Sequence, residues 1–165
     1  MGRKRRYLWI IAAAVLILVG IHLAGQSECW LQWRKVSMQE RIKESFTEHS
    51  AGYASFAQQM REYSAGGQDF AYYDNPSLAL PEDRILRTRK FLEETGIPYD
   101  SIYMGGMTQN VYPTDACVFR CTIAAGDRVY CWLDLVNSCQ EDPFRDLSGA
   151  VQLSPEWYMV VFWGF

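Results

Sequence analysis

The first pattern along the chain is an uninterrupted apolar run, YLWIIAAAVLILVGIHLAG, at Tyr7–Gly25. It contains no charged residue, and as a helix it would be about 28 Å long, close to the thickness of the hydrocarbon core of a bilayer. Basic residues precede it, and aromatic residues flank both of its ends, as in membrane-interface belts. The run therefore predicts a single-pass transmembrane signal anchor. Its expected membrane-interface residues are Arg3, Lys4, Arg5, Arg6, Tyr7, Trp9, Trp30 and Trp33.

The distribution of basic residues predicts the orientation of this span. Arg3–Arg6 precede it, whereas only Arg34 and Lys35 follow within about 15 residues of its other end. We therefore expect the N-terminus in the cytoplasm and the rest of the chain outside the cell membrane. A cleaved signal peptide is the alternative, which the length of the run disfavours. The expected parts are a cytoplasmic basic tail (1–6), the span (7–25), a juxtamembrane segment (26–35) and an extracytoplasmic domain (36–165).

Beyond the apolar run the pattern becomes helical. Apolar and aromatic residues recur at alternating steps of four and three, which places them on one stripe of a helix from about Val36 to Ser64. Small residues interrupt the middle of the stripe, so we expect this helix to pack on a sheet of its own domain, with a coiled-coil dimer as the alternative. The stripe consists of Ile42, Phe46, His49, Tyr53, Phe56, Met60 and Tyr63.

A second helix is predicted from Pro81 to Gly96, because proline suits the first helical position and glycine follows the last one. Short strands are predicted at Phe70–Tyr73 and Tyr99–Met104. The second helix carries a basic face, which is typical of a solvated helix surface. That face consists of Arg84, Arg87, Arg89 and Lys90.

Residues 117–135 alternate between apolar and other side chains with a period of two, which predicts a β-hairpin. A three-residue turn at Ala125–Asp127 would pair Ile123 with Val129. In that register Cys121 lies directly opposite Cys131, within reach of a disulfide. The hairpin therefore contains one candidate disulfide.

A second candidate disulfide joins Cys117 and Cys139, which would approach each other if the chain turns back after Asn137. Cys29 is then the odd cysteine. It is either a free thiol or a link between two chains. Five cysteines in an exported domain fit disulfides better than a zinc site, because no ligand spacing of the zinc-binding kind is present.

The last apolar run, WYMVVFWGF at Trp157–Phe165, is apolar on both faces, as in a central strand. Two helices followed by strands predict an α+β domain with the helices packed on one face of an antiparallel sheet. In element order this outline is similar to the cystatin-like and NTF2-like folds, in which a curved sheet wraps around a long helix. That resemblance implies no single function, because folds of this outline host both enzymes and binding modules.

The distribution of charged residues along the chain disfavours some classes of function. Four of the 16 basic residues precede the apolar run and all 19 acidic residues follow it, so Gln26–Phe165 has a net charge of −7. Such a domain is a poor candidate for binding nucleic acid. No spacing of histidine, cysteine or acidic residues predicts a metal or another cofactor.

These observations favour a membrane-anchored, non-enzymatic module that binds an extracytoplasmic protein or a small ligand. The candidate pocket residues are His49 and Tyr53, which share the helical stripe. One alternative is an extracytoplasmic thiol or acid–base hydrolase that uses His49 in a pocket between helix and sheet. The other is a homodimeric scaffold linked through Cys29.

Overall fold

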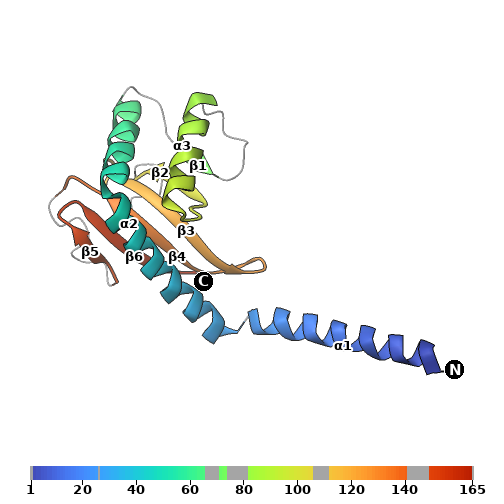
Figure 1. Cartoon of the computed structure of the whole chain (residues 1–165). Helices are drawn as coiled ribbons and strands as arrows, with labels where there is room; N and C mark the ends of the chain where they lie inside the picture. The colour runs from blue at the N-terminus through green and yellow to red at the C-terminus, as the bar shows by residue number, and fades with distance from the viewer. Residues whose placement is uncertain are drawn as a thin grey trace.

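The computed structural model describes residues 2–25, 27–65, 71–73, 82–105, 112–140 and 149–164. These residues form three helices and six strands, shown in Figure 1. In chain order they are α1 (Gly2–Gly25), α2 (Glu28–Ala65), β1 (Ala71–Tyr73), α3 (Glu82–Thr95), β2 (Ser101–Met104), β3 (Cys117–Ala125), β4 (Arg128–Asn137), β5 (Val151–Ser154) and β6 (Trp157–Trp163).

The strands form one antiparallel sheet in the order β1-β2-β3-β4-β6-β5. Helices α2 and α3 lie on one face of it (Figure 1). The predicted α+β arrangement is therefore confirmed. Strand β6 lies inside the sheet, between β4 and β5, as its two apolar faces predicted. The edge strand β5 was not predicted.

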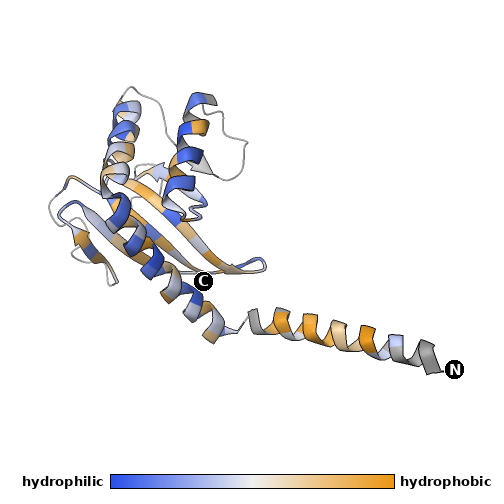
Figure 2. Cartoon of the chain, in the orientation of Figure 1, coloured by the Kyte–Doolittle hydropathy of each residue, from blue (hydrophilic) through white to orange (hydrophobic). Residues whose placement is uncertain are grey.

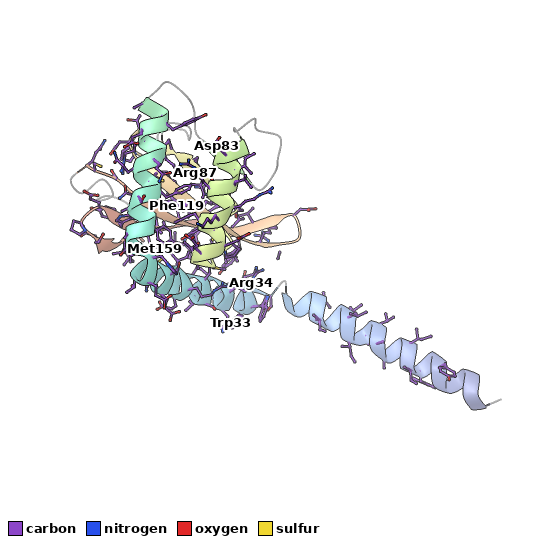
Figure 3. All side chains as sticks on the ribbon, turned by 45° about the horizontal axis from the view of Figure 1, so that its top comes forward. Trp33, Arg34, Asp83, Arg87, Phe119 and Met159 are labelled. Carbon is purple, nitrogen blue, oxygen red and sulfur yellow. The ribbon has the colours of Figure 1, made fainter. Side chains whose placement is uncertain are left out.

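The main core lies between the helices and the sheet. The stripe of α2 supplies much of it, because Ile42, Tyr53 and Met60 are almost completely buried. Strands β3 and β6 contribute Phe119 and Met159, both labelled in Figure 3. Burying side chains of this size contributes about 1.5–3 kcal/mol each, which is why the stripe holds α2 on the sheet.

A smaller apolar cluster covers the opposite face of the sheet. Residues that alternate with the helix-facing ones supply it, so several strands are buried on both faces. Trp157 and Met159 of β6 belong to the main core, whereas Tyr158 and Val160 belong to this second cluster. Its other members are Tyr103, Tyr112, Ala116, Val118 and Val136.

Helix α2 departs from its predicted course in two ways. It begins at Glu28 rather than near Val36, so most of the predicted juxtamembrane segment is helical. It also kinks at His49, whose backbone angles of φ −119° and ψ 22° are not helical. Ser50 and Gly52 follow the kink, and weak helix formers of this kind commonly accompany sharp bends. A regular spacing along the sequence cannot reveal such a bend.

Helix α3 and its end agree with the prediction. Gly96 follows the helix with φ 63°, the left-handed conformation that glycine adopts readily at a helix C-terminus. Its amide donates to the carbonyl of Leu92 at 3.1 Å, which satisfies one of the last helical carbonyls. Phe70 and Pro81 lie outside the described residues, as does the side chain of Arg84.

Helix α1 extends away from the domain in Figure 1, and Figure 2 shows its apolar character. The side chains from Trp9 to Ile21 are all exposed. Among the residues that the structure describes, no helix is both long enough and apolar enough to cross a membrane. The predicted span over residues 7–25 is therefore not confirmed. The side chains of Arg3–Arg6 lie outside the described residues.

Candidate functional site

An open groove of about 910 Å³ separates α2 from the hairpin formed by β5 and β6. One wall is the middle of α2 and the other is the hairpin with its turn at Pro155-Glu156. Clefts of this size commonly receive a ligand or a side-chain anchor of a partner. The lining residues are Lys43, Phe46, Thr47, Ser50, Ala51, Ala54 and residues 153–157.

Two aromatic rings line the groove together with the smaller apolar side chains of Ala51, Ala54 and Leu153. The centroids of Phe46 and Trp157 are 5.1 Å apart and their planes are inclined by 46°. Both residues are less than a tenth exposed, and Trp157 also packs on Tyr53 in the core. Because the core holds them, these rings form a rigid apolar surface rather than mobile side chains.

The groove is open because α2 presents small side chains to it. Ser50, Ala51 and Ala54 follow the kink at His49 and are exposed. The sequence suggested that small residues here allow close approach to a sheet, but Ala51 and Ala54 face solvent at the groove. That interpretation was wrong because the apolar stripe shows only which residues are apolar. It does not show which of the neighbouring small residues face the sheet once the helix is kinked.

Hydrogen bonds fix the hairpin wall of the groove. The carbonyl of Glu156 accepts from the amide of Ser138 at 2.9 Å and from Nδ2 of Asn137 at 3.1 Å. Nε2 of the Gln152 side chain donates to Tyr158 Oη at 3.3 Å. A turn held in this way does not have to be ordered when a ligand binds, which reduces the entropic cost of binding.

The charges at the groove are of opposite sign. Lys43 Nζ forms an ion pair with Glu40 Oε1 at 2.7 Å on the exposed surface of α2, and Glu156 is exposed on the hairpin turn. Exposed pairs of this kind contribute little to stability. The groove therefore combines an apolar centre with a balanced polar rim.

The two predicted pocket residues do not share a pocket. The side chain of His49 is 40% exposed and lies 3.9 Å from Glu48 Oε2. Tyr53, in contrast, is completely buried. The prediction that both face the packed side was wrong for His49, because the kink there turns this position out of the stripe. Neither residue lines the groove, although Tyr53 supports it through Trp157.

Tyr53 belongs to a chain of hydroxyl groups in the core. Its Oη lies 3.2 Å from Ser45 Oγ and 2.9 Å from Tyr99 Oη, while Ser45 Oγ donates to the carbonyl of Thr95 at 2.9 Å. Burial raises the pKa of both tyrosines, and the charge of Tyr53 raises that of Tyr99 further. These hydroxyls therefore stay protonated. Their hydrogen bonds join α2 to Thr95, the last residue of α3, and to Tyr99 beyond it.

The cysteine pairs predicted from the sequence are absent from the described residues, in which all five cysteines are free. Cys121 lies opposite Leu133 and Cys131 lies opposite Ile123. The pairing shifts because a bulge follows Ile123 and the turn contains only Gly126-Asp127. The two cysteines are thus diagonal neighbours, about 7–8 Å apart by the usual strand geometry and beyond ordinary disulfide reach.

The remaining cysteines occupy different environments. Cys117 is buried and its thiol donates to Met60 Sδ at 3.3 Å, whereas Cys139 is exposed. Cys29 is exposed in the first turn of α2. Burial raises the pKa of the Cys117 thiol above its ordinary value, which disfavours the reactive thiolate.

A buried ion pair on the opposite face of the sheet was not predicted. Arg120 donates two hydrogen bonds to Asp134, from Nε to Oδ1 at 2.8 Å and from Nη2 to Oδ2 at 2.6 Å. Tyr112 Oη donates a third to Oδ2 at 2.5 Å. The only signal in the sequence is that both charged residues occupy apolar strands. Because three donors hold the carboxylate, it is placed to stabilise the sheet rather than to accept a proton from a substrate.

Across the described ranges, no cluster of three or more histidine, cysteine or acidic side chains could hold a metal ion. No protein-family model matches the chain, and neither a curated protein nor a solved structure is significantly similar to it.

Proposed function

We propose that this protein is a membrane-tethered, non-enzymatic module that binds a segment of a partner protein in the groove between α2 and the β5–β6 hairpin. The single observation that supports it best is the open groove with an apolar centre at Phe46 and Trp157. A polypeptide is the better occupant than a small ligand because the groove is open along the surface. Partner segments commonly insert one apolar anchor into such a site.

The tether is supported by the sequence of Tyr7–Gly25 and by the exposure of α1. The exposed apolar side chains from Trp9 to Ile21 extend over about 20 Å of helix, and the same uncharged stretch continues on both sides of them. An exposed apolar surface of this extent is uncommon in a soluble monomer and is typical of a surface that lipid or protein covers. The basic residues before it favour an N-terminus in the cytoplasm and a domain outside.

A photo-crosslinking residue in the groove tests the proposal in intact membranes. Placed at Ala51, it should give a discrete adduct with one partner, whereas the same residue at the exposed Ser55, outside the groove lining, should not. A second change, Ala54→Trp, should fill the groove and abolish the adduct. Equal adducts from both positions, or an adduct that Ala54→Trp leaves unchanged, would refute groove binding.

The enzyme alternatives have less support. His49 is half exposed and its nearest described charged partner is Glu48. Burial raises the pKa of the Cys121 thiol, and it raises that of Cys131 to about 11. A thiol that remains protonated is a weak nucleophile. The raised pKa values therefore give no support to a thiol nucleophile at Cys121 or Cys131.

A homodimer linked through Cys29 is a second candidate, because this thiol is exposed beside the stacked rings of Trp30 and Trp33. Cys29→Ser should then remove a dimer band from a non-reducing gel of membranes. The matched control is Cys139→Ser, since Cys139 is the other exposed cysteine. A monomer in every lane would dismiss the covalent dimer without affecting the groove proposal.

A further inference from the structure

The end of the domain next to α1 carries a surface that combines aromatic and basic side chains. It comes from three separate parts of the chain, namely the start of α2, the tip of the β3–β4 hairpin and the end of β6. We call it the junction face. It consists of Trp30, Trp33, Lys35, Arg128, Tyr130 and Trp163.

Specific contacts hold these three parts together. Arg34 Nη1 donates to the carbonyl of Ala124 at 3.2 Å, and Tyr130 Oη donates to Gln32 Oε1 at 3.2 Å. Lys35 Nζ lies 4.5 Å from the centroid of the Trp163 ring, within the range of a cation–π contact. Figure 3 shows Arg34 and Trp33 at the start of α2, close to the end of α1.

The three tryptophan rings of the junction face are exposed although they are large. Trp33 is 58% exposed, Trp163 is 51% exposed and Trp30 is 44% exposed. Trp30 and Trp33 are stacked with centroids 4.9 Å apart, and Tyr130 meets Trp163 edge to face at 5.4 Å. Rings with an apolar body and a polar N–H or O–H group favour the boundary between water and lipid.

A pocket of about 310 Å³ opens within the junction face. Leu31, Tyr130 and Trp163 supply apolar walls, while Glu28 and Arg128 also line it. It therefore contains one negative and one positive side chain. This arrangement matches a zwitterionic headgroup, which carries a phosphate and an ammonium group.

We propose that the junction face lies on the headgroup layer of a zwitterionic phospholipid bilayer. The occupant follows from continuity, because the exposed apolar side chains of α1 reach Leu23 and the junction face begins at Trp30, in the first turn of the next helix. The domain then contacts the bilayer directly and is not attached to it through α1 alone. This inference rests on the membrane tether of the proposed function.

The local charge favours zwitterionic over anionic lipid. The domain as a whole is acidic. Near the junction face, however, the three basic residues Arg34, Lys35 and Arg128 are nearly balanced by Glu28 and Asp127. Binding should therefore depend on burial of the rings and little on the negative charge of the membrane.

Quenching of tryptophan emission by lipid tests the inference on the full chain. The protein is reconstituted into phosphatidylcholine vesicles with or without a nitroxide on the headgroup. The emission of Trp163 is the difference between the wild type and Trp163→Phe. We expect the nitroxide to reduce it by about half or more, because the ring lies at the depth of the label. Trp157→Phe is the matched control, since Trp157 is only 4% exposed and its emission should be unaffected.

The remaining outcomes separate the inference from the tether. If the protein floats with the vesicles while the emission of Trp163 is not quenched, the junction face is not on the bilayer and the inference is refuted. If the protein does not float, the tether itself fails. Quenching that requires phosphatidylglycerol in the vesicles would overturn the assignment to zwitterionic lipid.

Discussion

Arg120 on β3 and Asp134 on β4 are direct cross-strand neighbours, and their side chains form a bidentate ion pair on the face of the sheet away from the helices. The carboxylate of Asp134 is completely buried and the side chain of Arg120 is 22% exposed. Burial lowers the pKa of Arg120, but the hydrogen bonds and charge of Asp134 outweigh it and leave a net increase. Burial raises the pKa of Asp134, and the hydrogen bonds and charge of Arg120 oppose that rise. The bidentate contact is thus what favours the ionised carboxylate beside the guanidinium within the apolar layer.

Breaking this pair should destabilise the domain. Asp134→Asn leaves the guanidinium without its counter-charge, so we expect a loss of about 3–5 kcal/mol in the free energy of unfolding. Replacing both residues, as in Arg120→Met with Asp134→Leu, should recover most of that loss because no charge remains buried. Urea denaturation followed by circular dichroism measures both values. Asp127→Asn on the exposed hairpin tip is the control. An equal loss in the single and double variants would contradict this account.

Alkaline pH should destabilise the domain through its buried tyrosines. Burial raises the pKa of Tyr53 and Tyr99 above the ordinary value of 10.0. The unfolded state then loses these protons first, so the stabilisation is complete below pH 10.0 and is lost as pH rises above it. Each such group should lower the free energy of unfolding by about 1.4 kcal/mol per pH unit.

Denaturation midpoints between pH 8 and pH 11, measured in detergent at a constant salt concentration, test this dependence. Tyr99→Phe removes one titrating group and should make the decline shallower. Tyr7→Phe lies on α1, outside the core, and should leave the decline unchanged. A decline that is the same in Tyr99→Phe as in the wild type would exclude Tyr99 as its source.

The cysteines should differ in their reactivity. Cys29 and Cys139 are exposed, whereas Cys117, Cys121 and Cys131 are buried with raised pKa values. Iodoacetamide should therefore modify the first two in the native protein, and all five after unfolding without a reductant. Mass spectrometry counts the added groups. A pair of cysteines that reacts only after reduction would show that one of the disulfides expected from the sequence is present.

Alkaline carbonate tests the proposed tether. We expect the protein to stay with the membrane pellet, and Leu16→Arg combined with Leu18→Arg to release it, because each arginine in the apolar core of a bilayer costs about 2.5–3.5 kcal/mol. Leu86→Arg is the matched control, since Leu86 is exposed on α3 within the domain. Release of the wild-type protein would remove the tether from the proposal.

The sequence predicted those features that depend on local spacing. The stripe of α2 identified Ile42, Tyr53 and Met60 as core residues, and the alternation in β3 identified the side that faces the helices. Both are periodic patterns, and a helix or a strand converts them directly into one buried face. The two apolar faces of β6 likewise indicated a central strand.

The candidate groove could not be predicted in the same way. Its aromatic centre joins Phe46 and Trp157, which are far apart in sequence and meet only when β6 packs under α2. Its opening depends on the kink at His49, and no proline marks that bend. The exposed small residues after the kink are the one signal that the sequence contains.

The sequence by itself determined the apolar run of α1, the helical and strand periods and the acidic charge of the domain, because these properties belong to consecutive residues. Tertiary structure decided the rest. The bulge after Ile123 moved Cys131 away from Cys121, and the kink moved His49 out of the core. Neither the bulge nor the kink changes the spacing of apolar residues along the sequence, so the periodic pattern does not reveal them. In a hairpin, a register shift changes the neighbour of every side chain that follows.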